Sequence, residues 1–199
     1  MRTLLVATTN PGKLREIQWL MAGVAVRLTS LADLPSVEEP DETGTTFEEN
    51  ARLKARYYSD WSGLWTVAED SGLVVDALGG EPGVRSARYL RADATYPERF
   101  ADIYRRLDSR RDAPRSARFV AALASVEDGR ITYETTGVVE GTIAAAPRGS
   151  GGFGYDPIFF YPPYGRTLAE VTEPEKIAVA HRGIAFRRFA EWISSSEER

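Results

Sequence analysis

The distribution of apolar positions along the chain predicts alternating strands and helices. Residues 3–7 (TLLVA) and 64–70 (LWTVAED) are short apolar runs of the length that buried strands have. After the first run, a turn at TTNPGK leads into apolar residues with helical spacing, at Leu14, Ile17, Leu20 and Met21. The chain is therefore expected to begin as a strand, a turn and a helix.

Three further helices are indicated by caps and by amphipathic spacing. Thr45 and Thr46, followed by Glu48 and Glu49, form overlapping capping boxes that open a helix with Phe47, Ala51, Ala55 and Tyr58 on one face. A second amphipathic helix is expected over residues 94–107 (ATYPERFADIYRRL). One long last helix is expected to begin near residues 173–176 (EPEK) and to turn its aromatic residues inward.

Two apolar segments, residues 117–126 and 131–143, flank the sequence EDGR, whose Asp-Gly pair is typical of a β-hairpin. A hairpin beside strand–helix units predicts an α/β class with a mixed central sheet. With 199 residues, 43% of them hydrophobic, the chain is expected to form one domain over residues 1–199, in which two lobes could enclose a cleft.

Composition narrows the possible chemistry. The absence of cysteine excludes disulfides, thiolate nucleophiles and Cys-ligated metals, and the single histidine, His181, excludes a His-rich metal site. A metal would be held by carboxylate oxygens, which points to Mg²⁺ or Mn²⁺. The net charge of −4 without a basic block argues against nucleic acid, and no apolar run is long enough to span a membrane. These features favour the cytoplasm.

The segment GGFGYDP, residues 151–157, completes a G-x-G-x-x-G match at Gly149, Gly151 and Gly154. A dinucleotide fingerprint needs a helix after its last glycine, whereas this chain continues as YDPIFF, which predicts a strand. The glycines are therefore expected to serve another purpose.

Four segments carry candidate chemistry. In TTNPGK, Lys13 lies in the first turn of a helix, where Thr8, Thr9 and Asn10 could complete a phosphate cradle; the alternative is an ordinary strand–helix turn. Asp70 ends a strand, as a metal ligand or base would, or else forms an Asp-Ser-Gly turn with Ser71.

The third segment is the acidic loop before the capped helix, where Asp41 and Glu42 are either solvated or metal ligands. The fourth pairs GGFGYDP with EKIAVAHR, in which Lys176, His181 and Arg182 could hold a ring and a phosphate or form the polar face of a helix. Only three of the 25 basic residues are lysines, Lys13, Lys54 and Lys176, which favours sites that require a compact ammonium over chance. Lys54 is expected to pair with Asn50 or to contact the acidic loop.

Five motifs, in order, resemble those of the inosine triphosphate pyrophosphatase family, also called Ham1-like: TTNPGK, TGTTFEENARLKA, EDSGLVVDALGGEPGVRSARY, GGFGYDPIF and EKIAVAHR. They span nearly the whole chain. The resemblance implies an elongated α/β fold with two lobes around a deep substrate cleft, a homodimer and a Mg²⁺ requirement, with Mn²⁺ as a substitute. In one place the chain departs from the family, because Ala180 stands where a serine is usual.

The resemblance also implies roles for single residues. The triphosphate would be held by Thr8, Thr9, Asn10, Pro11, Gly12 and Lys13, with Lys176 on a phosphate. Asp70 would bind the metal and act as the catalytic base beside Ser71, with Asp41 favoured as the second metal ligand and Glu42 close behind. The purine would meet Phe153, Gly154, Tyr155 and Asp156, and its edge would meet His181 and Arg182.

The function implied is hydrolysis of ITP, dITP and XTP to the monophosphate and pyrophosphate, with ATP rejected because it lacks a 6-keto oxygen. A non-catalytic nucleotide sensor on the same scaffold is the first alternative, but it would not need the acidic residues. A nucleotide kinase is the second, and the chain lacks the Walker lysine–serine pair that would support it.

Overall fold

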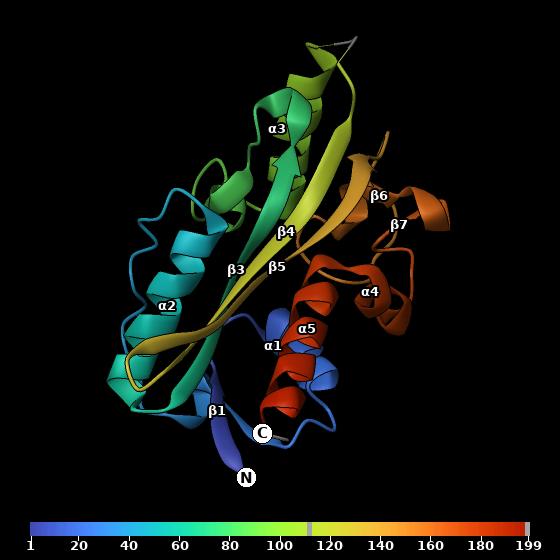
Figure 1. The fold of residues 1–199 in the computed structure, drawn as a ribbon. Helices are drawn as coiled ribbons and strands as arrows, with labels where there is room; N and C mark the ends of the chain where they lie inside the picture. Colours follow the sequence, from blue (N-terminus) through green and yellow to red (C-terminus); the bar gives the residue numbers. More distant parts are fainter. Residues whose placement is uncertain (111–112, 198–199) are drawn as a thin grey trace. The chain divides into compact units, whose positions relative to one another are not determined.

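The computed structural model describes residues 1–110 and 113–197. Its strands are β1 (Arg2–Val6), β2 (Val26–Ser30), β3 (Trp65–Val75), β4 (Ser116–Glu127), β5 (Arg130–Ile143), β6 (Phe159–Tyr161) and β7 (Arg166–Thr167). Its α-helices are α1 (Pro11–Leu20), α2 (Phe47–Ser62), α3 (Tyr96–Asp108), α4 (Glu173–Val179) and α5 (His181–Glu197). Figure 1 labels these elements along the chain, except β2.

The strands form one mixed sheet in the order β2-β1-β3-β4-β5-β6-β7. Strand β1 pairs in parallel with β2 and β3, whereas β6 pairs antiparallel with β5 and β7. The α/β class and the mixed sheet predicted from the sequence are therefore confirmed. The turn between β4 and β5 places Asp128 and Gly129 at φ 49° and 72°, the positive values that a two-residue hairpin turn requires.

The chain folds as two compact units. Unit 1 comprises residues 1–70, 121–137 and 181–199, and unit 2 comprises residues 71–120 and 138–180. Strands β3, β4 and β5 contribute residues to both units. Each unit has a hydrophobic cluster of its own.

In unit 1, helices α1 and α5 lie side by side over β1 (Figure 1). Their buried residues Ile17, Phe186 and Phe189 share a cluster with Leu4 and Val6 of β1. Leu5, between the last two, points to the other face of the strand and is also fully buried, so both faces of β1 are covered. Two-sided burial explains why this strand reads as a continuous apolar run.

In unit 2, helix α3 packs its apolar face on the sheet. Phe100 and Ile103 belong to a cluster that also contains Phe119 of β4 and Tyr155 and Phe159 of the segment after β5. Phe119 and Phe159 are 4.6 Å apart between ring centroids. The segment GGFGYDP is thus anchored at its carboxyl end by the core of unit 2.

The single last helix expected from residue 173 onward is wrong, because two helices are present. Helix α4 ends at Val179, and Ala180 adopts an extended conformation with φ −68° and ψ 153° before α5 begins at His181. The residue at this break is the one at which the sequence departs from the motif of the family that it resembles. Serine, threonine, asparagine and aspartate are favoured immediately before a helix because their side chains accept hydrogen bonds from its first N–H groups.

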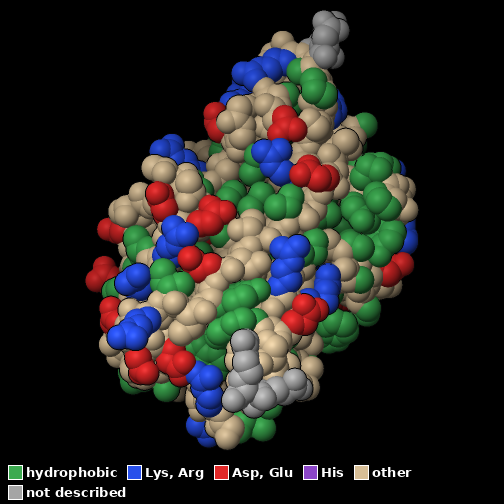
Figure 2. All heavy atoms as spheres, viewed as in Figure 1, with side chains coloured by type: hydrophobic (Ala, Val, Ile, Leu, Met, Phe, Trp, Pro, Cys, Tyr) green, Lys and Arg blue, Asp and Glu red, His purple; other side chains and the backbone are tan. Residues whose placement is uncertain are grey.

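Figure 2 shows lysine and arginine side chains interspersed with aspartate and glutamate on the face displayed. Among the residues that the structure describes, no helix has both the length and the apolar character that crossing a membrane demands.

Candidate active site

The turn TTNPGK caps helix α1 in unit 1. Asn10 Oδ1 accepts hydrogen bonds from the backbone N–H groups of Gly12 at 2.9 Å and Lys13 at 3.1 Å, and Thr8 Oγ1 accepts one from Asn10 N at 3.2 Å. Pro11 occupies the first helical position, where no N–H is needed. Asn10 therefore uses its carbonyl oxygen to cap the helix, a role that explains the residue without a ligand.

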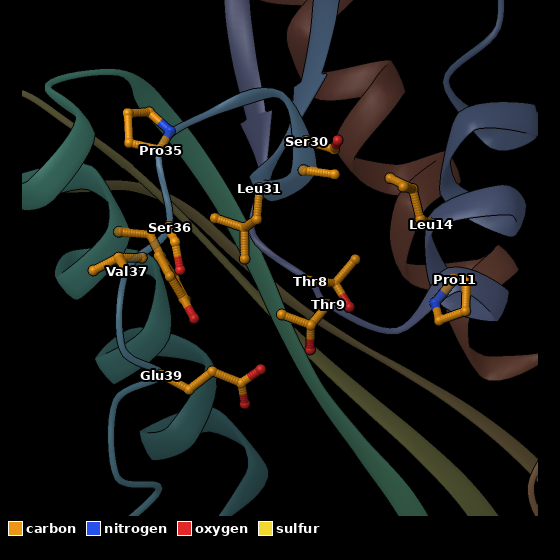
Figure 3. Close-up of a pocket in the computed structure, with 12 residues that line it drawn as sticks. Thr8, Thr9, Pro11, Leu14, Ser30, Leu31, Pro35, Ser36, Val37 and Glu39 are labelled. Carbon is orange, nitrogen blue, oxygen red and sulfur yellow. The ribbon is translucent and has the colours of Figure 1, made fainter.

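A pocket of about 360 Å³ opens beside this turn (Figure 3). Thr8, Thr9, Pro11 and Leu14 line one side of it, and residues 30–32, 35–37, Glu39 and Tyr58 complete the lining. The described lining includes hydroxyls and one carboxylate but no lysine or arginine. The charge of a triphosphate at Thr8 and Thr9 would therefore have to be met elsewhere, by Lys13 and the N-terminus of α1.

The side chain of Lys13 joins a buried cluster of charges within unit 1. Its Nζ lies 3.0 Å from Oε1 of Glu69. Arg182 donates to the same carboxylate twice, from Nε at 2.9 Å and Nη2 at 2.7 Å, and from Nη1 to Oε2 of Glu16 at 2.5 Å. Two cations from α1 and α5 thus balance two carboxylates from α1 and β3.

Burial and pairing act in opposite directions on these groups. Burial alone would raise the pKa of Glu69, but Arg182 and Lys13 outweigh it and hold the pKa far below its ordinary value. Burial lowers the pKa of Lys13, with Glu69 opposing it. Glu69 is therefore an ionised carboxylate that organises cations.

Asp70, the next residue of β3, has a different environment. Its side chain accepts from Asn50 Nδ2 at 3.1 Å and from Lys54 Nζ at 3.0 Å. Burial raises the pKa of Asp70, with Lys54 lowering it and Glu42 raising it further. A buried carboxylate whose proton affinity is increased is suited to accept a proton from water.

Lys54 links Glu42 of the acidic loop to the carboxylate of Asp70. Lys54 Nζ donates to Oε1 of Glu42 at 2.7 Å as well as to Asp70, and Glu42 is half-buried. The predicted contact of Lys54 with the acidic loop is therefore confirmed. Asp41, favoured from sequence as the second metal ligand, is exposed, and its backbone carbonyl accepts from Thr43 N. The structure brings Glu42, not Asp41, into the network of Asp70.

In the described ranges 1–110 and 113–197, no group of three or more histidine or acidic side chains is arranged to hold a metal ion. The two carboxylates that the structure brings together here are Asp70 and Glu42, which both accept from Lys54 Nζ. Mg²⁺ is commonly bound through one or two carboxylates together with substrate phosphates, so these residues fit that ion once a nucleotide supplies the remaining oxygens.

In unit 2, the segment GGFGYDP is organised around Asp156. Its Oδ2 accepts from Phe153 N at 2.8 Å and from Lys176 Nζ at 2.6 Å. The Lys176 ammonium also lies 4.4 Å from the centroid of the Phe153 ring. Asp156 and Lys176 are 2% and 4% exposed, so the pair is an internal support for the half-buried Phe153.

The glycines of this segment have a structural reason of their own. Gly152 adopts φ +66°, and a Cβ there would lie 2.1 Å from Asp156 Oδ2. Gly149 adopts φ +80°, and a Cβ there would lie 2.3 Å from the carbonyl oxygen of Ala169. Approach of the Asp156 carboxylate and of the residue 169 backbone requires these glycines, whether or not a ring approaches as well.

Tyr155 is directed into the core rather than along a surface. It is 4% exposed, its hydroxyl donates to the carbonyl of Ser86 at 2.9 Å, and its ring meets Tyr96 edge-on at 5.4 Å. Gly154, with φ +68°, borders the same Tyr96 ring. The sequence predicts a contact between Tyr155 and a base. Because the side chain of Tyr155 is buried, only its backbone could make that contact.

The remaining predicted residues are Ser71, His181 and Arg182. Ser71 follows Asp70 within β3 and is half-buried. His181, 6% exposed, begins α5 and contributes to lowering the pKa of Glu69. Arg182 is 1% exposed, and the nitrogens of its guanidinium donate to Glu69 and Glu16. Its contact with a purine edge stays a prediction.

Sequence reasoning missed Glu16, Glu69 and Asn50 as members of the site. Glu16 carries the one usable signal, because it lies three residues after Lys13 on the otherwise apolar face that includes Ile17. Asn50 and Glu69 gave no such signal, since their partners are 20 and 113 residues away in the chain.

The sequence of this chain is similar to that of known proteins over nearly its whole length. The model of the Ham1 family matches residues 4–192. The dITP/XTP pyrophosphatase of Geobacillus kaustophilus is 46% identical over 191 residues, which cover 96% of this chain and 94% of that protein. The dITP/XTP pyrophosphatase of Gloeobacter violaceus is 48% identical, over 94% and 92% of the two chains.

A solved structure also matches nearly the whole chain. The HAM1 protein from Coxiella burnetii superimposes with a TM-score of 0.89 at 39% identity, over 98% of this chain and all of that one.

Proposed function

The chain belongs to the Ham1 family, and on this basis we propose that it hydrolyses non-standard purine nucleoside triphosphates to the monophosphate and pyrophosphate. The observation that carries the proposal is Asp70, a buried carboxylate of raised pKa that Asn50 and Lys54 hold in place. A nucleotide sensor would have no use for such a group.

Asp70 acts as the base. Water attacks the α-phosphorus, its proton passes to Asp70, the new P–O bond forms, and the bond to the bridging oxygen breaks to release pyrophosphate. Lys54 and Asn50 fix the orientation of the carboxylate by binding both of its oxygens. A positioned base of this type contributes on the order of 10²–10⁴ to the rate.

Asp70 and Glu42 would hold Mg²⁺, or Mn²⁺ in its place. The bound ion would supply charge neutralisation on the phosphates and a lower pKa for the attacking water. Lys54 contacts both carboxylates, so it keeps them together when their charges would otherwise repel. Asp41, one residue earlier, remains the alternative ligand.

The phosphates are proposed to lie beside Thr8, Thr9 and Lys13, at the positive end of the α1 helix dipole. Asn10, Pro11 and Gly12 shape this turn. Glu69 keeps the Lys13 ammonium in one position, at 3.0 Å. We propose that the developing charge on pyrophosphate is stabilised there.

The base is proposed to stack on Phe153, whose ring Lys176 supports from 4.4 Å, with Gly154 and the backbone of Tyr155 continuing the wall. Selection for a 6-keto oxygen requires a hydrogen-bond donor at the purine edge, for which His181 and the backbone are the candidates, together with Arg182. Ser71 would contact the substrate beside Asp70. A homodimer in the cytoplasm is part of the same proposal and rests on the family resemblance.

The test is product identification. The protein is incubated with dITP, XTP or ATP and Mg²⁺, and pyrophosphate, orthophosphate and monophosphate are measured. We expect equal amounts of pyrophosphate and monophosphate from dITP and XTP, and little turnover of ATP. Release of orthophosphate, or binding without turnover, would contradict the proposal.

Asp70→Asn should retain the fold and lose several orders of magnitude in kcat, because it removes a base and a metal ligand together. Asp60→Asn is the matched control, since Asp60 is an exposed aspartate of α2 in the same unit. Comparing Glu42→Gln with Asp41→Asn at several Mg²⁺ concentrations identifies the second ligand: its loss should raise the Mg²⁺ requirement.

A further inference from the structure

Arg99 of α3 is a buried cation that the proposed reaction does not use. It is 4% exposed, and its Nε has no hydrogen-bond partner among the described residues. Its Nη1 donates to the carbonyl of Ser86 at 3.3 Å, and its guanidinium carbon lies 4.9 Å from the centroid of the Tyr96 ring. Neither contact brings a negative charge.

The carboxylates nearest to Arg99 in the chain serve other cations. Glu98 pairs with Arg91, and Asp102 pairs with Arg105 and accepts from Tyr89. No ion pair of Arg99 with a carboxylate is present in residues 1–110 and 113–197. A buried charge without a counter-charge is costly to folding, so its retention calls for a compensating benefit.

Arg99 is linked by contacts to the wall proposed for the base, and all of the residues involved belong to unit 2. The Tyr96 ring on which it packs borders Gly154, since a Cβ on Gly154 would lie 3.7 Å from Tyr96 Oη. The Ser86 carbonyl to which it donates also accepts the hydroxyl of Tyr155. Arg99 also interacts directly with the Tyr155 side chain, and it lies one side chain, that of Tyr96, away from Gly154.

The other cation at this wall is already balanced. Lys176, beside the Phe153 ring, is paired with Asp156 at 2.6 Å. Arg99 therefore supplies the uncompensated positive charge behind Gly154 and Tyr155.

We propose that Arg99 is a specificity-determining residue that favours a purine base carrying a negative charge, and so favours XTP over ITP. This inference rests on the function proposed above. The 2-oxo group of xanthine makes its ring N–H acidic, so the base is substantially anionic at neutral pH, whereas hypoxanthine stays neutral. A positive charge in a low-dielectric wall stabilises the anionic base and leaves the binding of the neutral one almost unchanged.

The experiment compares kcat/KM for XTP and ITP in the wild type and in variants of Arg99. Arg99→Gln keeps a side-chain N–H donor but removes the charge, and Arg99→Met removes both. A full charge at roughly 10 Å and an effective dielectric of ~20 is worth on the order of tenfold. We therefore expect the XTP-to-ITP ratio to fall about tenfold in both variants, and to be largely retained in Arg99→Lys.

Arg105→Met is the matched control, because Arg105 is an exposed arginine of the same helix. It should leave the ratio unchanged. Thermal unfolding of each variant reports its folded fraction, and the ratio of two substrates on one preparation does not depend on that fraction.

The outcomes separate this inference from the function on which it rests. A wild type that releases pyrophosphate from neither XTP nor ITP overturns both. A wild type that hydrolyses both substrates, with the ratio preserved in Arg99→Gln and Arg99→Met, overturns the role of Arg99 alone and assigns it to packing.

Discussion

Arg182 holds Glu69 with two hydrogen bonds, from Nε and Nη2, although the two residues lie 113 positions apart in the chain. The third nitrogen donates to Glu16, so one guanidinium neutralises carboxylates from α1 and β3 at once. This arrangement makes Arg182 a central structural element of unit 1, whatever it contributes to substrate recognition.

Replacing Arg182 with methionine should therefore destabilise the protein strongly. It leaves Glu16 and Glu69 buried with one fewer cation, and breaking a buried pair in this way costs about 3–5 kcal/mol. Urea unfolding measures the loss. Arg188→Met is the control, because Arg188 lies on the same helix and is bound at the surface to the carbonyl of Thr136, so a loss within about 1 kcal/mol is expected. Equal losses in the two variants would show that the buried cluster adds no stability.

The depressed pKa of Glu69 predicts a sensitivity to acid. A carboxylate with a lower pKa in the folded state stabilises the protein above its unfolded pKa, about 4.3. This stability is lost as the pH falls below that value toward the folded pKa. The free energy of unfolding of the metal-free protein should decrease steeply as the pH is lowered through this range. In Glu69→Gln the number of protons taken up on unfolding, which sets this slope, should be smaller by about one. An unchanged slope would show that Glu69 does not cause the acid sensitivity.

Gly152→Ala should disturb the wall proposed for the base. The new Cβ would lie 2.1 Å from Asp156 Oδ2, so the carboxylate that holds Phe153 N and Lys176 would have to move. We expect a raised KM for XTP in addition to the cost of a positive φ, which is about 1 kcal/mol. Gly63→Ala isolates that cost, because Gly63 has φ +67° with open space around its Cα. Equal KM values for the two variants would refute the role of Gly152.

Ala180→Ser should stabilise the protein. Ala180 is extended and directly precedes α5, so a serine hydroxyl there could cap the first N–H groups of that helix. The expected gain is about 0.5–2 kcal/mol in the free energy of unfolding. Ala180→Val, which adds a branched side chain without an oxygen, serves as the control and should give no gain. A serine variant no more stable than the parent would mean that the usual serine has another purpose.

Local signals carried most of the fold. The capping box of Thr46 and Glu49, the hairpin at Asp128-Gly129 and the helical spacing from Leu14 onward each act over a few residues, and each was predicted. The break at Ala180 was missed because alanine gives no stop or start signal: it is a good helix former that happens to be extended here.

The sequence allowed the residues of the candidate site to be predicted, but not the contacts between them. Asp70, Lys13 and Lys176 were singled out from sequence, but nothing local reveals that Lys176 pairs with Asp156, 20 residues earlier, or that Glu42 rather than Asp41 meets Lys54. The side chains of Asp41 and Glu42 differ by one methylene and one position, and the direction each takes is decided by the loop conformation.

The buried cluster of Lys13, Glu16, Glu69 and Arg182 carries two positive and two negative charges that sum to zero. No member can be replaced alone by a residue of different charge without leaving a net charge in the interior of unit 1. Such a group constrains the evolution of the sequence, because a substitution that changes the charge at one of these positions requires a compensating substitution at a second. Among descendants of this chain, these four positions should be inherited together or exchanged in pairs, even where the surrounding apolar residues vary freely.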